Sequence, residues 1–324
     1  MRRRQFVKFI GGVALAWPLN AGAQQSGRLY RIAYFSAGAA GAQGREGYFI
    51  EALHELGWIE GKNVTFEYRY ADNHLDRLSG MAAELVQLKV DVIVGDGTLA
   101  SLAAKQATAT IPIVMAPAGD PLGSGLVPSL ARPAENVTGL SLMAPDLGGK
   151  RLELLNELLP GISRVAILWN AANPYAANVF RETQRAAQTL RIALQSLEVR
   201  NPDDFDAAFE AAKVRHPEAL ITVEDPLTRS YRKQIAEFAA RNRLPAIYGV
   251  REFVQVGGLI AYGASLYDLS RRAATTAGIV EAGTIALPQD QLRCGGGGAT
   301  IRRSVSRGAS DGAEPDHPRS RRHR

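Results

Sequence analysis

Short apolar runs rich in β-branched residues alternate with longer amphipathic segments from residue 30 to residue 262. In the longer segments the apolar residues recur at helical spacing, as at Phe49, Ile50, Leu53 and Leu56. The short runs lack a clean alternation of apolar and polar residues, which is typical of strands buried on both faces of a parallel sheet. The expected strands are Arg31–Phe35, Val64–Tyr70, Asp91–Val94, Ile111–Met115, Val137–Leu142, Val165–Trp169, Leu194–Val199, Ala219–Val223, Ala246–Tyr248 and Leu259–Tyr262.

The pattern starts twice, first with Ala33-Tyr-Phe-Ser36 and again with Ile167-Leu-Trp-Asn170. This repetition predicts an α/β protein with two Rossmann-like lobes, each a parallel sheet flanked by helices. We expect lobe 1 to hold residues 24–136 with about 263–284, and lobe 2 to hold residues 137–262. The strand at 137–142 then crosses between the lobes, and the chain crosses back after the strand at 259–262.

The first 25 residues have the features of an export signal. Arg2, Arg3, Arg4 and Lys8 precede an apolar run that ends at Leu19, which is too short to cross a bilayer of about 30 Å as a helix. Small residues then lead to expected cleavage near Ala23, so we expect residues 1–23 to be a signal peptide and the protein to be periplasmic. The alternatives are a membrane anchor or a buried helix, and the paired arginines also fit the twin-arginine route.

The net charge gives no support to a nucleic-acid partner. Of the formal +6, residues 1–23 and residues 285–324 each contribute +4, which leaves −2 for residues 24–284. The Lys and Arg residues of that body are therefore interpreted as a solvated exterior. The single cysteine, Cys294, excludes an intrachain disulfide and a cysteine-based zinc site. The five histidines are scattered, and we expect no cofactor and no metal.

Polar side chains follow several of the expected strands. Ligands of open parallel sheets bind beyond the carboxyl ends of the strands, where helix N-termini offer free N–H groups. Taken alone, each of these residues has a structural interpretation that is simpler than ligand binding. Thr98 and Asn173 are typical helix caps, and Asp120 and Asp225 precede prolines in turns. Tyr248 fits a core. Taken together, they predict a ligand site between the lobes, formed by Ser36, Gly97, Thr98, Asp120, Asn170, Asp225 and Tyr248.

An exported NAD(P)-type Rossmann-like enzyme is the alternative function. It depends on the glycine-rich segment Gly38-Ala-Ala-Gly41-Ala-Gln-Gly44, whose spacing differs from the dinucleotide-binding fingerprint. The acidic residue that this fingerprint requires at the end of the second strand is also missing, since that strand ends in Tyr70. No catalytic set of nucleophile, base and oxyanion donors is recognisable, so we expect no enzyme activity.

Several long motifs resemble bacterial ABC-transporter substrate-binding proteins related to tryptophan- and tyrosine-binding lipoproteins. They are Arg2-Arg-Arg-Gln-Phe, Phe49-Ile-Glu-Ala-Leu-His-Glu-Leu-Gly-Trp-Ile-Glu-Gly-Lys-Asn-Val64, Gln106-Ala-Thr-Ala-Thr-Ile-Pro-Ile-Val114, Gly119-Asp-Pro-Leu-Gly-Ser-Gly-Leu-Val127, Leu130-Ala-Arg-Pro-Ala-Glu-Asn-Val-Thr-Gly139 and Gly257-Gly-Leu-Ile-Ala-Tyr-Gly263.

The resemblance implies a type I periplasmic binding fold whose two lobes close on a small ligand. The ligand expected from it is an amino acid or related carboxylate, delivered by a monomer to an ABC permease in the inner membrane. The seven cleft residues named above carry over by position. Asp96 departs from the small or hydroxyl residue expected there, and no lipobox cysteine stands near Ala23, so a soluble rather than lipid-anchored member is expected.

Residues 285–324 differ from the rest of the chain in composition. They contain a tetraglycine at Gly295–Gly298, scattered Arg, no Lys and no apolar periodicity, which predicts a disordered or non-native tail. The resembling proteins end instead with another strand and helix. With suitable codons for residues 289–298, a shift of one base encodes Lys-Thr-Asn-Phe-Asp-Val-Val-Val-Val, a strand-like segment. We interpret the tail as a frameshift product, which predicts an unpaired edge on the sheet of lobe 2.

Overall fold

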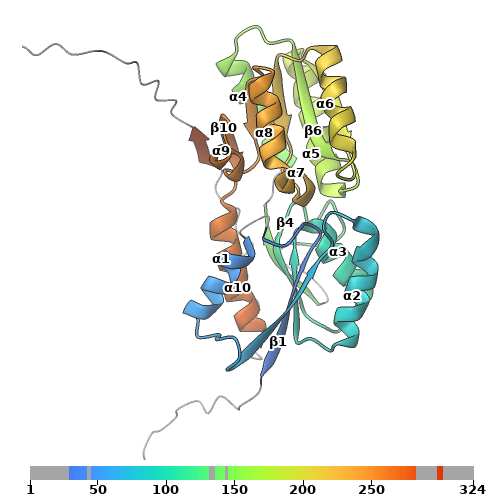
Figure 1. Ribbon diagram of the computed structural model, residues 1–324, viewed down its shortest axis with the longest axis vertical. Coiled ribbons are helices and arrows are strands. Elements are labelled where there is room, and N and C mark those ends of the chain that lie inside the picture. Colours follow the sequence, from blue (N-terminus) through green and yellow to red (C-terminus); the bar gives the residue numbers. More distant parts are fainter. Residues whose placement is uncertain (1–28, 42–44, 131–135, 143–144, 282–297, 302–324) are drawn as a thin grey trace, which may run out of the picture.

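Two α/β lobes stand one above the other, with lobe 2 at the top of Figure 1. The computed structural model describes residues 29–41, 45–130, 136–142, 145–281 and 298–301. The expected signal at 1–23 and the tail apart from residues 298–301 lie outside these ranges. The fold-class prediction is confirmed, since both lobes contain a parallel sheet flanked by helices.

The sheet of lobe 1 has five parallel strands in the order β2-β1-β3-β4-β5. Alternate residues of β1 belong to different cores: Ile32 and Tyr34 to the core that contains Phe49 of α1, and Ala33 and Phe35 to the core that contains Leu85 of α2. The strands are β1 (Tyr30–Ser36), β2 (Val64–Tyr70), β3 (Val92–Asp96), β4 (Ile113–Ala118) and β5 (Val137–Ser141).

Helices cover both faces of this sheet because both faces are apolar. One face carries α1 (Arg45–Glu55), and the other carries α2 (Leu78–Gln87) and α3 (Thr98–Ala107), preceded by a short 3₁₀ turn at Leu75–Arg77. Burying one aliphatic or aromatic side chain of such a core stabilises the fold by about 1.5–3 kcal/mol.

The sheet of lobe 2 repeats the winding of the first, with parallel strands in the order β7-β6-β8-β9-β10. The strands are β6 (Arg164–Asn170), β7 (Ala193–Val199), β8 (Ala219–Thr222), β9 (Ala246–Tyr248) and β10 (Ile260–Gly263). The helices are α4 (Pro145–Leu158), α5 (Pro174–Leu190), α6 (Asp204–Arg215), α7 (Pro226–Ser230), α8 (Arg232–Arg241) and α9 (Glu252–Gln255).

An additional strand, β11 (Gly298–Ile301), pairs antiparallel with β10. The expectation of an unpaired edge at this end of the sheet is therefore wrong for β10. A free strand edge offers unpaired N–H and C=O groups to any extended segment. Here the four residues of β11 pair with the edge of β10. The interpretation of the tail as a frameshift product stays a prediction.

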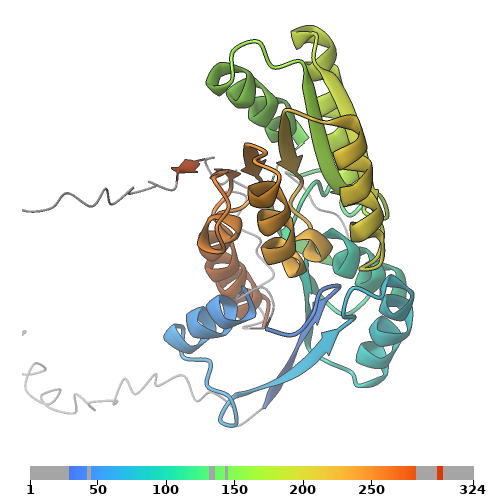
Figure 2. The same ribbon diagram turned by 45° about the horizontal axis from the view of Figure 1, so that its top comes forward.

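The lobes exchange their last helices. After β5 the chain enters lobe 2 and forms α4, which packs on α5; after β10 it returns and forms α10 (Leu266–Glu281), which packs on α1 and β4. In Figures 1 and 2 the orange α10 lies beside the blue α1. The expected start of lobe 2 at residue 137 is corrected, because β5 pairs with β4 and completes the first sheet.

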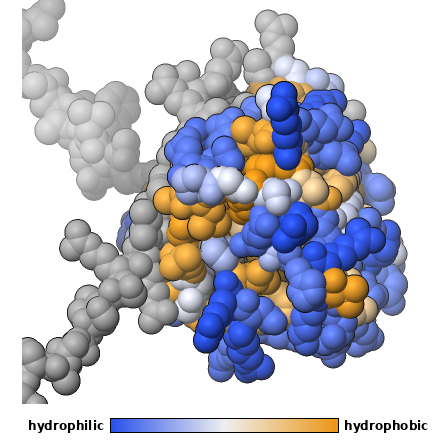
Figure 3. All heavy atoms as spheres, turned by 90° about the horizontal axis from the view of Figure 1, so that it is seen from above, coloured by the Kyte–Doolittle hydropathy of each residue, from blue (hydrophilic) through white to orange (hydrophobic). Residues whose placement is uncertain are grey.

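The surface seen from the lobe 2 end is mainly hydrophilic, with hydrophobic areas between the charged side chains (Figure 3). The large apolar side chains exposed on this lobe are Leu158, Val214 and Leu259. Within the described ranges, no helix combines the length and the apolar character needed to cross a membrane.

Candidate functional site

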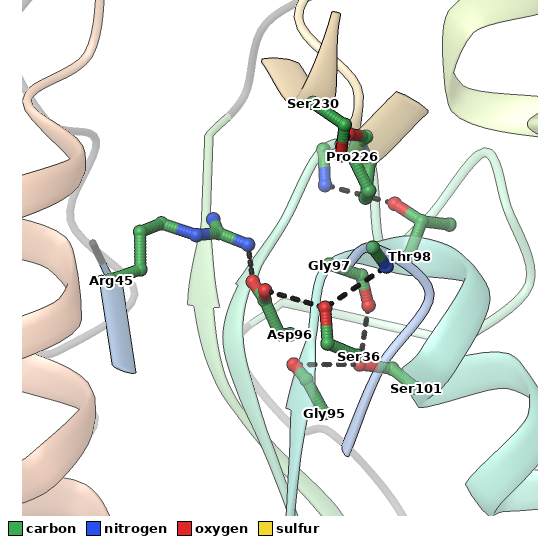
Figure 4. A network of polar contacts seen from close by, with 11 residues as sticks. Ser36, Arg45, Gly95, Asp96, Gly97, Thr98, Ser101, Pro226 and Ser230 are labelled. Atoms are coloured by element: carbon green, nitrogen blue, oxygen red, sulfur yellow. Dashed lines mark hydrogen bonds and ion pairs between the residues drawn. The ribbon is translucent and has the colours of Figure 1, made fainter. Parts of the chain in front are cut away.

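The carboxyl ends of the two sheets face each other. In each sheet the strand order reverses between the first and third strands of the lobe, at β1/β3 and at β6/β8. We call each of these places the switch point of its lobe, and ligands of such sheets bind there. Gly97, directly after β3, lies against Pro226, which begins α7 soon after β8. In Figure 4, Pro226 and Ser230 of lobe 2 lie above Gly97 and Thr98 of lobe 1.

In lobe 1 the switch point carries a buried polar network of three side chains. The Ser36 hydroxyl donates to Oδ2 of Asp96 over 3.0 Å and accepts from the Gly38 N–H over 3.2 Å. Asp96 forms an ion pair with Arg45 at the start of α1, and both side chains are only 2% exposed. Figure 4 shows Arg45 and Ser36 reaching Asp96 from opposite sides.

The charges of this pair depend on each other. Burial and the positive charge of Arg229 lower the pKa of the Arg45 guanidinium, and Asp96 is the carboxylate that forms an ion pair with it. The carboxylate of Asp96 is therefore already neutralised within lobe 1. The Ser36 proton is likewise donated to Asp96 and is not free for a ligand carboxylate in this arrangement.

Thr98 does not cap α3, so that interpretation is wrong. The N-cap is Gly97, whose φ of 90° is the left-handed region that glycine adopts without strain. The Thr98 hydroxyl instead accepts from the Gly119 N–H over 3.1 Å and ties the end of β3 to the loop after β4.

Asp120 connects the two lobes. Its Oδ1 accepts from the Gly123 N–H over 2.9 Å within its own turn, and its Oδ2 accepts from Nδ2 of Asn178 on α5 over 2.7 Å. The turn interpretation is therefore right, and the contact to Asn178 adds a hydrogen bond across the gap between the lobes.

In lobe 2 the polar residues expected at the strand ends bind one another. Asp225 accepts from Nδ2 of Asn170 over 2.9 Å, from Nδ2 of Asn173 over 2.7 Å and from the Leu227 N–H over 2.8 Å. Burial raises the pKa of Asp225, and these three hydrogen bonds oppose the rise. Asn173 caps α5, as its sequence position predicted, and Asp225 caps α7, where the sequence predicted a turn before proline.

Sequence reasoning missed a second buried ion pair, between Arg151 of α4 and Glu224. Nη1 of Arg151 lies 2.9 Å from Oε2 of Glu224, and Nη2 donates to Oε1 over 3.1 Å. The Tyr175 hydroxyl donates to the same Oε1 over 2.5 Å, and burial raises its pKa well above the ordinary value. Glu224 was recognisable as a residue beyond the end of β8, whereas Arg151 lies in a helix and gave no signal.

Tyr248 is a core residue. It is 1% exposed, and its ring stacks on Phe253 with centroids 4.4 Å apart and an interplanar angle of 11°. Burial raises the pKa of its hydroxyl. Within the described residues no hydrogen bond joins Tyr248 to the other six predicted site residues, so the structure favours the packing interpretation for it.

A cavity of about 270 Å³ opens at the lobe 1 switch point. It brings Ser36 and Asp96 together with an acid and two aromatic rings that sequence reasoning did not select. Its lining residues are Tyr34, Ser36, Ala39, Gly41, Glu46, Gly47, Tyr70 and Asp96. Across the part of the chain that the structure describes, no cluster of His, Cys, Asp or Glu is suited to hold a metal ion.

A sequence model of the family described as ABC transporter substrate binding protein matches residues 32–285. The chain belongs to this family. This substrate-binding protein is 26% identical over 226 residues to the tyrosine-binding protein of Clostridioides difficile. The match covers 69% of this chain and 64% of that relative. The chain thus aligns with less than two thirds of the relative's length.

Solved structures share the type I periplasmic binding fold with this substrate-binding protein. A conserved domain protein from Vibrio cholerae matches with a TM-score of 0.77 at 24% identity, over 84% of this chain and 91% of the other. An ABC domain from Streptococcus pneumoniae in complex with L-Trp matches with a TM-score of 0.74 at 21% identity, over the same shares. At these identities the likeness concerns the fold alone.

Proposed function

We propose that this protein is the solute-binding component of an ABC importer, which binds an amino acid or related small carboxylate between its lobes. The proposal is supported mainly by one observation: the switch points of the two lobes face each other, and both carry polar side chains. The hydrogen bond from Asn178 to Asp120 crosses the gap, so closure of the lobes forms specific contacts.

The ligand class draws on the relatives. The Clostridioides difficile relative is called a tyrosine-binding protein, and the Streptococcus pneumoniae structure contains L-Trp. The family match favours a binding protein over the NAD(P)-type enzyme, whose glycine-rich segment lacks the fingerprint spacing. Family membership and the expected signal at residues 1–23 support a periplasmic location and delivery of the ligand to a membrane permease, and we propose that the protein acts as a monomer.

Thermal unfolding of the purified mature protein against a ligand panel tests the function. The panel contains L-tyrosine, L-tryptophan, L-phenylalanine, L-leucine, several small carboxylates and NADPH. A ligand that binds only the folded state stabilises it by about 2.7 kcal/mol at 100 times its Kd, which raises the unfolding midpoint. We expect at least one amino acid or carboxylate to raise the midpoint. If NADPH alone raises it, the enzyme alternative replaces the proposal; if no member does, the ligand class is wrong.

A further inference from the structure

The cavity at the lobe 1 switch point has aromatic walls. Tyr34, two residues before the end of β1, and Tyr70, at the end of β2, both line it. Their ring centroids are 6.3 Å apart with an interplanar angle of 43°. The volume of about 270 Å³ is near the lower end for small-molecule pockets, which suits one functional group of a ligand rather than a large molecule.

Two carboxylates line this cavity, Asp96 and Glu46, and the positive charges of Arg45 and Arg229 act on its Tyr34 wall. Asp96 is neutralised by Arg45, which leaves Glu46 in the first turn of α1. The Glu46 carboxylate accepts a hydrogen bond from the Tyr70 hydroxyl, and it takes part in no ion pair among the described residues. Glu46 is half-buried, and burial raises its pKa, so its carboxylate lacks both full hydration and a cation.

The Ser36 hydroxyl, deeper in the cavity, disfavours an anionic ligand group. The Ser36 proton is donated to Asp96, so the hydroxyl offers no donor to a carboxylate. Among the described residues, the lining includes no Lys, Arg or His. An ammonium group is attracted by a carboxylate and by the faces of tyrosine rings, whereas a carboxylate is repelled by both.

The two acids that the sequence offered for an ammonium group are occupied elsewhere. Asp225 accepts three hydrogen bonds as the cap of α7, and Asp120 accepts from Gly123 and from Asn178. Glu46 differs from both, because among the described residues its side chain has one hydrogen-bond partner, the Tyr70 hydroxyl of the cavity wall.

We infer that this cavity holds the ammonium group of the ligand, with Glu46 as its counter-ion and the rings of Tyr34 and Tyr70 beside it. The inference depends on the proposed function and narrows its ligand to an amine-bearing small molecule. A simpler role for Glu46 is to stabilise the N-terminus of α1 through the helix dipole, which requires no cavity and no selectivity between ligands.

The test uses L-tyrosine, tyramine and 3-(4-hydroxyphenyl)propionate, which are the amino acid, its amine without the carboxylate and its carboxylate without the amine. Each is titrated calorimetrically into wild type, Glu46→Gln and Glu51→Gln. Glu51→Gln is the matched control, because it removes the same charge from an exposed position of the same helix. Unliganded unfolding midpoints of the variants show any loss of helix stability separately.

We expect tyramine to bind wild type more tightly than the propionate, and Glu46→Gln to weaken tyrosine and tyramine about 10- to 100-fold, the range for a lost charged hydrogen bond. Glu51→Gln should bind like wild type. If tyramine fails to bind wild type, or binds Glu46→Gln equally well, the inference is overturned. The proposed function still stands if an amino acid or carboxylate of the wider panel binds, and it fails with the inference if none does.

Discussion

Nδ2 of Asn178 lies 2.7 Å from Oδ2 of Asp120, and this hydrogen bond joins a helix of lobe 2 to a loop of lobe 1. Two further contacts support the same approach of the lobes. The Ser230 hydroxyl lies 3.5 Å from Oδ1 of Asn73, and Gly119 lies against the ring of Tyr175. The two switch points are thus held together by a few identifiable side chains, each of which is open to mutation.

Asn178→Ala should weaken ligand binding by removing one of these contacts. A neutral hydrogen bond contributes about 0.5–1.5 kcal/mol, so we expect the Kd to rise about 2- to 12-fold. Isothermal titration with whichever panel ligand binds measures the change. Gln184→Ala, at an exposed position of the same helix, is the control and should leave the Kd at the wild-type value. Equal Kd values for the two variants would show that the contact does not contribute to the bound state.

Gly119→Ala should hold the lobes apart. A Cβ at this position overlaps the ring of Tyr175, which is fixed by its hydrogen bond to Glu224. We expect at least a tenfold loss of affinity, and a radius of gyration by small-angle scattering that no longer decreases when ligand is added. The overlap lies between the lobes and outside the strands of both sheets, so the unfolding midpoint should stay near that of wild type.

Gly80→Ala provides the comparison for this variant. Gly80 lies in α2, where an added Cβ meets no atom within 4 Å and alanine favours the helix. It should bind ligand like wild type and unfold at the same or a slightly higher temperature. Normal closure of Gly119→Ala in the scattering experiment would contradict the prediction.

Arg151→Met should destabilise the protein by about 3–5 kcal/mol, because it leaves the buried Glu224 carboxylate without its cation. The double variant Arg151→Met with Glu224→Gln removes both charges and should recover a large part of this loss. Urea unfolding measures both free energies. The neighbouring Lys150→Met breaks an exposed pair with Glu153 and should leave the free energy of unfolding near the wild-type value. A small effect of Arg151→Met would mean that water or another group compensates Glu224.

Acid should destabilise the protein partly through Glu218. Its carboxylate accepts from the Ser163 and Arg164 N–H groups over 2.6 and 3.1 Å, and these bonds lower its pKa in the folded state. The unfolded chain therefore takes up the proton at a higher pH than the folded one. This contribution to stability is present above the ordinary pKa and is lost as the pH falls through the lowered one.

Glu218→Gln should reduce that loss. Thermal unfolding between pH 6 and pH 3 should give a shallower decline for the variant than for wild type. Because backbone donors rather than the nearby Arg164 charge are the main cause, 1 M NaCl should leave most of the difference in place. Parallel declines for the two proteins would contradict the assignment.

Local patterns in the sequence were enough for the elements and for some site positions. Ile32 and Tyr34 point to one core and Ala33 and Phe35 to the other, because side chains of a strand alternate between its faces. Ser36 and Asn170 end the first strands of their lobes, and parallel strands bring such ends to one edge of a sheet. The caps at Asn173 and Asp225 are also local, since each accepts from the N–H two residues ahead.

Two parallel sheets flanked by helices, the repeat of the pattern and the family could all be recognised in the sequence. The tertiary structure was needed to show that β5 completes the first sheet, that α4 and α10 change lobes, and that Gly97 rather than Thr98 caps α3. It also decided that Arg151 neutralises Glu224, 73 residues away, and that Glu46 lies beside Tyr70 in a cavity. The reason is physical: periodicity and capping involve neighbours along the chain, whereas a buried charge selects its partner by proximity in space, which one sequence does not record.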